Sequence, residues 1–283
     1  MRIVGLGAAG CSLARAFAKF PQYETVGIDS EKGADISIRE RASHEEYDTN
    51  FPNLKKKLKF SNEEVVVITA GSGRISGGIL RLLEQLQNNR LTVLYLQSDL
   101  SLAGETQKIQ ERIVANVLQE YARSGALEAI WLIDNHHLAA GLGDIPIMGY
   151  YDVLNQAIVN MVHMVNVFKN SQPVIGNFIE PSSISRIATF GIVDMETSQE
   201  KWFYDLTTPR DVVYYYGINE NELKEDGSLF KTITEFVKSK LNDNINVSYG
   251  VFQTTYDQKY CYCIKYSSMV QSFIETIGDQ DIS

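Results

Sequence analysis

Two glycine-rich segments have the composition of turns that bind phosphate groups. The first segment is Gly5-Leu6-Gly7-Ala8-Ala9-Gly10-Cys11-Ser12, and the second is Gly71-Ser72-Gly73-Arg74-Ile75-Ser76-Gly77. Each follows a short apolar run and leads into a helical pattern. Glycine lets the backbone approach an anion closely, and a helix N-terminus supplies free N–H groups and a partial positive charge. We therefore expect both segments to be anion-binding turns between a strand and a helix.

The first segment alone leaves several kinds of site open. Its G-x-G-x-x-G spacing, followed about twenty positions later by Asp29, is typical of dinucleotide-binding domains, where the acidic residue holds a ribose. NAD or FAD on Gly5, Gly7 and Gly10, another phosphate ligand, and a purely structural turn all remain open. The second segment is either an anion site or a flexible loop before a helix. Two such turns on neighbouring parallel strands could hold both ends of a triphosphate, whereas a dinucleotide domain does not need the second.

The longest helical pattern covers residues 150–169. Apolar residues occupy nearly its whole circumference, which is typical of a buried helix, and at ~1.5 Å per residue it spans about 30 Å. Its first turn places Tyr151 and Asn155 one turn apart on the same face. A loop beyond its far end contains one carboxylate, Glu180. We expect this helix to cross the molecule between two domains, with a base-binding pair at its beginning.

Strands and helices alternate before the central helix, which predicts an α/β domain with a doubly wound parallel sheet over residues 1–149. The strands are expected at 2–5, 24–28, 64–69, 91–97 and 129–134, and the helices at 11–20, 79–87 and 105–124. Ligands of such sheets bind at the carboxyl ends of the strands. Both glycine segments, and the pair Asp134-Asn135, follow strands at these ends.

The pattern changes after the connecting helix of residues 150–170. Residues 171–283 predict a smaller α+β domain. Its expected elements are a short helix at 182–190, strands at 192–195, 201–206 and 212–216, a helix at 228–241, and a closing hairpin of strands at 247–253 and 260–266. The end of the chain from Gly278 is acidic and expected to be disordered.

The composition excludes several classes of protein. Hydrophobic residues make up 44% and charged residues 22% of the chain, which is typical of soluble globular proteins. A net charge of −9 argues against a nucleic-acid partner bound through phosphate neutralisation. Cys11, Cys261 and Cys263 form no metal-binding pattern and predict reduced thiols in a cytoplasmic compartment. No signal peptide and no membrane-spanning segment is expected.

Together, the two glycine segments, Asp134-Asn135, the Tyr-x-x-x-Asn that opens the long helix and the second α+β domain resemble the tubulin/FtsZ superfamily, and in particular its divergent phage and plasmid members. The resemblance covers residues 1 to about 190, and beyond them only the order of elements. It implies GTP or GDP as the ligand, with Mg²⁺ as a further candidate. It places the two glycine segments around the phosphates, although Arg74 and Ile75 depart from the family signature GGGTGTG, and Ser12 stands where bacterial FtsZ has asparagine. Arg74 either offers a charge to a phosphate or points into solvent.

The resemblance also implies how the base and the ribose are bound. Tyr151 matches the aromatic residue that stacks on guanine, and Asn135 and Asn155 match the amides that read its edge. An asparagine side chain offers both a donor and an acceptor, as guanine's edge requires. For the ribose the candidate is Glu105, or Asp99 with worse spacing.

In this family the loop beyond the central helix completes the nucleotide site of the next subunit, so the resemblance implies head-to-tail filaments of identical subunits. Glu180 takes the place of the first catalytic aspartate, but Ser183 replaces the second, which predicts slow or absent GTP hydrolysis. The alternatives are a non-hydrolysing tubulin-like scaffold or assembly regulator and, further away, an NAD- or FAD-dependent oxidoreductase. An adaptor protein is an additional candidate partner.

Overall fold

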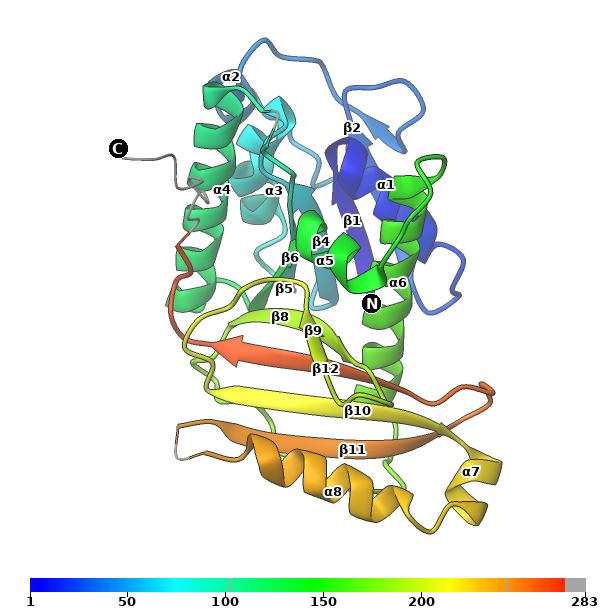
Figure 1. Ribbon diagram of the computed structural model, residues 1–283. Coiled ribbons are helices and arrows are strands. Elements are labelled where there is room, and N and C mark those ends of the chain that lie inside the picture. Colours follow the sequence, from blue (N-terminus) through cyan, green and yellow to red (C-terminus); the bar gives the residue numbers. More distant parts are fainter. Residues whose placement is uncertain (102, 243, 273–283) are drawn as a thin grey trace.

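The chain is described here by a computed structural model over residues 1–101, 103–242 and 244–272 (Figure 1). The segment from Gly278 onward, which the sequence predicts to be disordered, lies outside these residues. The first part of the chain contains β1 (Arg2–Leu6), α1 (Gly7–Phe17), β2 (Glu24–Asp29), β3 (Ile36–Ser37), α2 (His44–Thr49), β4 (Glu64–Ala70), the 3-10 helix η1 (Arg74–Gly78), α3 (Ile79–Gln85), β5 (Arg90–Gln97), α4 (Glu105–Ser124), β6 (Ala129–Asp134) and α5 (Asn135–Leu142).

The strands of this first part form the predicted parallel sheet, in the order β3-β2-β1-β4-β5-β6. Successive residues of each strand face opposite sides, so both faces are apolar and both are covered by helices. In β4, for example, Val67 packs with residues of α2, α3 and α4, whereas Ile68 packs with residues of α1, α5 and α6. The expected α/β class is confirmed.

The central helix α6 (Tyr150–Lys169) has the predicted bounds. Its early residues, such as Leu154, belong to the same apolar cluster as α1 and β4, and its last turn reaches the second part of the chain. There Phe168 stacks on Phe252, with 4.4 Å between ring centroids. Helix α6 therefore packs on both parts of the molecule, as its apolar circumference predicts (Figure 1).

The second part contains β7 (Ile175–Asn177), β8 (Ile187–Val193), β9 (Glu200–Trp202), β10 (Asp211–Asn219), α7 (Glu220–Glu225), α8 (Leu229–Lys240), β11 (Asn246–Thr254) and β12 (Tyr260–Ser267). Helix α8 packs on one face of these strands through Leu229, Ile233 and Val237, whereas α6 covers the other face. The predicted α+β character is present. The division of the chain at residues 149/150 and 170/171 stays a prediction, since β8 pairs with β6 and all twelve described strands form one sheet.

Two predictions for the second part were wrong. The short helix expected at 182–190 does not form: residues 182–186 make a turn and loop, and residues 187–190 begin strand β8. Strand β8 lies between β6 and β12 and bonds to both. The expected closing hairpin does not form either. Strand β10 lies between β11 and β12, parallel to the first and antiparallel to the second. Pairing with a strand distant in sequence overrides the local pattern in both cases.

Candidate functional site

The first glycine turn passes directly into helix α1, which begins at Gly7, earlier than the expected Cys11. Gly7 has φ 77°, a value that favours glycine. A methyl group on Gly5 would overlap the carbonyl oxygen of Gly10, so the turn closes tightly. Ala8 and Ala9 are exposed, which leaves the N-terminal N–H groups of α1 open at the sheet edge.

Cys11 contributes its backbone to this turn but not its side chain. Its thiol is buried, and burial raises its pKa to about 11, with Asp29 as the next cause. The thiol is therefore neutral and faces the core. Ser12, one residue on, is half-buried, and its hydroxyl accepts a hydrogen bond from the side-chain amide of Asn155 at 3.1 Å. This contact joins the first glycine turn to the N-terminal part of α6.

The second glycine turn is more ordered than expected, because residues 74–78 form the 3-10 helix η1 before α3 begins. Ser76 is fully buried, and its hydroxyl lies 2.7 Å from the carbonyl oxygens of both Gly71 and Gly73. It therefore shapes the turn rather than facing a ligand. Gly73 and Arg74 are exposed and Ser72 is half-buried, so the outer side of the turn is accessible.

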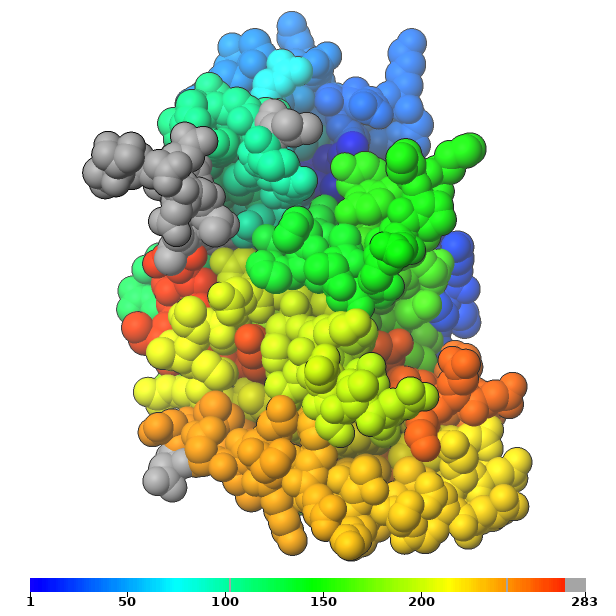
Figure 2. Space-filling model, in the orientation of Figure 1, coloured from blue at the N-terminus to red at the C-terminus, as the bar shows by residue number. Residues whose placement is uncertain are grey.

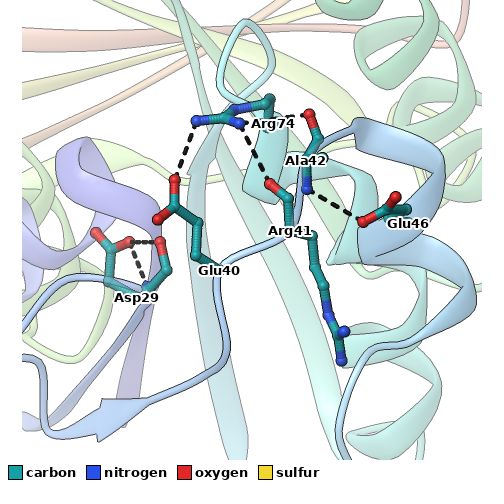
Figure 3. A network of polar contacts seen from close by, with 7 residues as sticks. Asp29, Glu40, Arg41, Ala42, Glu46 and Arg74 are labelled. Atoms are coloured by element: carbon teal, nitrogen blue, oxygen red, sulfur yellow. Dashed lines mark hydrogen bonds and ion pairs between the residues drawn. The ribbon is translucent and has the colours of Figure 1, made fainter.

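The Arg74 side chain is more than half exposed and lies against the segment before α2, and its role toward a phosphate stays a prediction. Its guanidinium donates to the backbone oxygens of Arg41 and Ala42, each at 3.3 Å, and lies 3.2 Å from the carboxylate of Glu40 (Figure 3). It thereby connects the second glycine turn to the segment before α2. Both ends of the ion pair are more than half exposed, so the pair contributes about 0–1 kcal/mol.

The two glycine turns lie side by side at the carboxyl ends of β1 and β4. A methyl group on Gly7 would lie 2.8 Å from a side-chain carbon of Ile75, and one on Gly10 would lie 2.5 Å from the carbonyl oxygen of Ile68. The second glycine turn also contacts the turn that follows β5, since the hydroxyls of Ser72 and Ser98 are 2.9 Å apart. The juxtaposition expected from the sequence is therefore present.

The end of β6 is built around Asp134. One of its carboxylate oxygens accepts hydrogen bonds from the backbone amides of His136 and His137, at 2.7 and 3.1 Å, and so caps α5. The other oxygen accepts from the side-chain amide of Gln97 at 2.9 Å, which links the ends of β5 and β6. Helix α5 was not expected from the sequence, although an aspartate at this position is a recognised helix-start signal. Asn135 is its first residue and is half-buried at this edge.

Tyr151 is free to contact a ligand. It is 69% exposed and packs edge-on against Tyr150, with 5.4 Å between ring centroids. Both ribose candidates stay predictions. Glu105 is exposed at the start of α4 and pairs with Lys108 at 3.5 Å. The Asp99 carboxylate accepts a hydrogen bond from the backbone amide of Ser101, which lowers its pKa, and nearby His136 lowers it further.

Glu180 lies away from these residues, on the loop between β7 and β8. Strand β7 pairs with β11 at the far edge of the sheet, and Phe178 packs edge-on against Tyr215 at 5.2 Å. The backbone oxygen of Ile179 accepts from the hydroxyl of Ser248 at 3.4 Å. The exposed Glu180 carboxylate is thus held on the second part of the chain, as expected. Ser183 is also exposed.

Solved structures of FtsZ and TubZ match nearly the whole chain. An FtsZ dimer of M. jannaschii matches with a TM-score of 0.69 at 12% identity, over 99% of this chain and 94% of that chain. GDP-form protofilaments of TubZ from Bacillus thuringiensis serovar israelensis match with a TM-score of 0.70 at 15% identity, over 95% and 87% of the two chains. The GTPγS-form protofilament gives 0.70 at 16% identity, over 95% and 88%.

The chain has the tubulin/FtsZ fold. The resemblance seen in the sequence is confirmed at the level of the fold. No protein-family model and no curated protein sequence matches the chain. Asp29 is buried, and its carboxylate accepts a hydrogen bond from the backbone amide of Ser30 at 2.6 Å. The side chain that an oxidoreductase would use for the ribose is therefore engaged locally.

No group of three or more His, Cys, Asp or Glu side chains in residues 1–101, 103–242 and 244–272 is arranged to hold a metal ion. Within the same residues, no helix combines the length and the apolar character needed to cross a membrane.

Proposed function

We propose that this chain binds GTP or GDP at the carboxyl ends of β1, β4, β5 and β6. The observation that supports this most is the contact between the two glycine turns, since a methyl group on Gly7 would lie 2.8 Å from a side-chain carbon of Ile75 and both turns lie at the same sheet edge. The start of α1 faces the same edge and adds free N–H groups and a partial positive charge. The guanine base rests on Tyr151, and Asn135 and Asn155 read its edge.

If Mg²⁺ accompanies the nucleotide, the nucleotide phosphates and waters would supply most of its ligands. Mg²⁺ is commonly held by one or two carboxylates together with substrate phosphates and waters. The described residues offer no cluster of three or more acidic, His or Cys side chains for it. If Mg²⁺ contributes through the phosphates, a chelator is expected to weaken nucleotide binding without abolishing it.

Tyr151→Ala tests the base site. Removing the exposed ring is expected to weaken GDP binding by about 5- to 150-fold, because base–aromatic stacking contributes about 1–3 kcal/mol. Calorimetric titration of the purified protein measures the change. Tyr121→Ala is the matched control, since Tyr121 is a partly exposed tyrosine of α4. Equal affinity of the wild-type and Tyr151→Ala proteins would contradict the proposed position of the base.

We propose further that the subunits assemble head to tail, with the Glu180 loop of one subunit facing the nucleotide of the next. Exposed apolar side chains occur both near the proposed nucleotide site and beside the Glu180 loop. Ile147 and Met148, in the segment before α6, are 94% and 91% exposed, and Val174 and Ile184, which flank the Glu180 loop, are 60% and 54% exposed. The green segment before α6 is on the molecular surface (Figure 2). A heterologous contact of this kind does not close, so it produces filaments.

Glu180→Ala tests the proposed role of the Glu180 loop at the contact between subunits. If the carboxylate positions the attacking water across the interface, GDP and GTP binding are unchanged, while phosphate release falls at least about tenfold and light scattering by GTP filaments persists longer. Glu196→Ala, on an exposed turn between β8 and β9, is the control. Turnover that is unaffected by Glu180→Ala would defeat the catalytic assignment, and no nucleotide-dependent scattering at any protein concentration would defeat assembly.

A non-hydrolysing scaffold or assembly regulator is the second candidate. Two observations favour it. Ser183 stands where the family has a second carboxylate, and the exposed Arg74 of the altered signature is bound to Glu40 and the adjacent backbone. This candidate predicts nucleotide-dependent assembly without phosphate release.

A further inference from the structure

A fully buried carboxyl group, that of Glu111 on α4, lies directly beneath the second glycine turn. A methyl group on Gly71 would lie 3.1 Å from the carboxyl carbon of Glu111 and 3.0 Å from its Cα. The turn and the helix are therefore in contact at this point. A buried carboxyl group is costly unless it is neutral or well paired, so its position needs an explanation.

The carboxyl group of Glu111 is only partly hydrogen-bonded. Its Oε1 accepts from the hydroxyl of Tyr95 at 2.6 Å, and the same hydroxyl lies 3.1 Å from the backbone oxygen of Glu111. Its Oε2 is buried and has no hydrogen-bond partner among the residues described. One oxygen is thus available to attract N–H groups of the turn above it.

The surroundings of Glu111 act on the pKa of its carboxyl group in opposite directions. Burial raises its pKa to about 7, while the Tyr95 hydroxyl and then the backbone amides of Ser98, Ser72 and Gly71 lower it. These amides belong to the two turns that meet at the Ser72–Ser98 contact. The group therefore changes charge near neutral pH, at the place where the proposed phosphates would add negative charge.

We propose that Glu111 is a positioning residue of the nucleotide site. As a carboxylate it draws the N–H groups of the second glycine turn toward α4, and as a neutral acid it leaves them to the nucleotide phosphates. This inference rests on the proposed nucleotide site. Since phosphates repel the ionised carboxyl group, nucleotide binding takes up a proton and the affinity falls as the pH rises past neutrality.

Other titratable groups near this carboxyl group lie on β5, α2 and α4, and Tyr204, between β9 and β10, adds to the raised pKa of Tyr95. Strand β5 presents Tyr95, whose pKa is raised well above its usual value by burial, with Glu111 as the next cause. The glycine turn presents no ionisable side chain toward it, although His44 of α2 lies 3.3 Å from Ser76 within that turn. Burial lowers the pKa of His44. On α4 itself, Lys108 and Arg112 are the neighbouring charges. All of these are retained in Glu111→Gln, so a comparison with that variant isolates Glu111.

The test is GDP affinity against pH in the wild-type protein, Glu111→Gln and the control Glu120→Gln, an exposed glutamate of the same helix. Titration of the GDP phosphates is common to all three and cancels in the ratios. If binding raises the pKa of Glu111 by one unit, wild-type affinity falls about fivefold relative to Glu111→Gln between about pH 6 and pH 8. Glu120→Gln is expected to follow the wild type.

Parallel pH profiles for the wild type and Glu111→Gln would overturn this inference and leave the proposed function standing. Absence of GDP binding at every pH would overturn both. Tyr95→Phe provides a second test if Glu111→Gln folds poorly. Removing the hydroxyl that lowers the pKa of Glu111 is expected to move the loss of affinity to higher pH. A profile for Tyr95→Phe that coincides with the wild type would also overturn the inference.

Discussion

Gly71→Ala is expected to destabilise the protein by about 2–3 kcal/mol, because its methyl group would overlap the buried hydroxyl of Tyr95 and press on the backbone of Glu111. The clash involves a strand and a helix that are both tightly packed, so neither side can move without disturbing the core. The change also displaces the second glycine turn, and GDP binding is expected to weaken with it. Chemical denaturation monitored by circular dichroism measures the loss of stability.

Gly73→Ala is the matched control for this prediction. Gly73 belongs to the same turn, and no atom lies within 4 Å of the position of its added methyl group. Its backbone is extended, with φ −80° and ψ 141°, which alanine adopts freely. The free energy of unfolding of the Gly73→Ala protein is expected to stay within about 0.5 kcal/mol of the wild-type value. Equal effects of the two substitutions would show that the turn is not packed against Tyr95 and Glu111 as described.

The second large effect is the pH dependence of stability that Glu111 imposes. Its pKa is about 7 in the folded protein and 4.5 in an unperturbed carboxyl group. The folded state therefore holds a proton that the unfolded state has lost, and stability declines as the pH rises through this range. Between about pH 5.5 and pH 8.5 the wild-type protein is expected to lose about 2 kcal/mol relative to Glu111→Gln.

Denaturant unfolding of the wild-type protein and Glu111→Gln across this pH range tests the effect without any nucleotide. Glu120→Gln is expected to reproduce the wild-type slope, since Glu120 is exposed and pairs with Arg123 at 2.7 Å. A constant difference between the wild type and Glu111→Gln at all pH values would mean that Glu111 does not titrate here. In that case GDP affinity is also not expected to fall with pH relative to Glu111→Gln.

Much of the fold follows from local patterns in the sequence. The helical repeat of residues 150–169 predicted α6 with its observed bounds, and the strands β4, β5 and β6 followed from continuous apolar runs. The glycine segments predicted where the turns lie, because only a residue without a side chain permits the close backbone contact between Gly5 and Gly10. These features depend on interactions between residues close in the chain, so the sequence alone determines them.

Other features depend on partners far away in the chain. The first residues of β8 belong to a segment predicted as a helix and form a strand because β6 and β12 flank them. Strand β10 separates the two strands expected to form a hairpin. The side chain of Arg74 turns to Glu40, and Ser76 turns inward. Glu111, an ordinary polar residue of an amphipathic pattern in the sequence, becomes a buried acid beneath the glycine turn. Tertiary packing decides these features. Strand pairing depends on which strands lie alongside, and the charge of a side chain depends on its burial and on its neighbours.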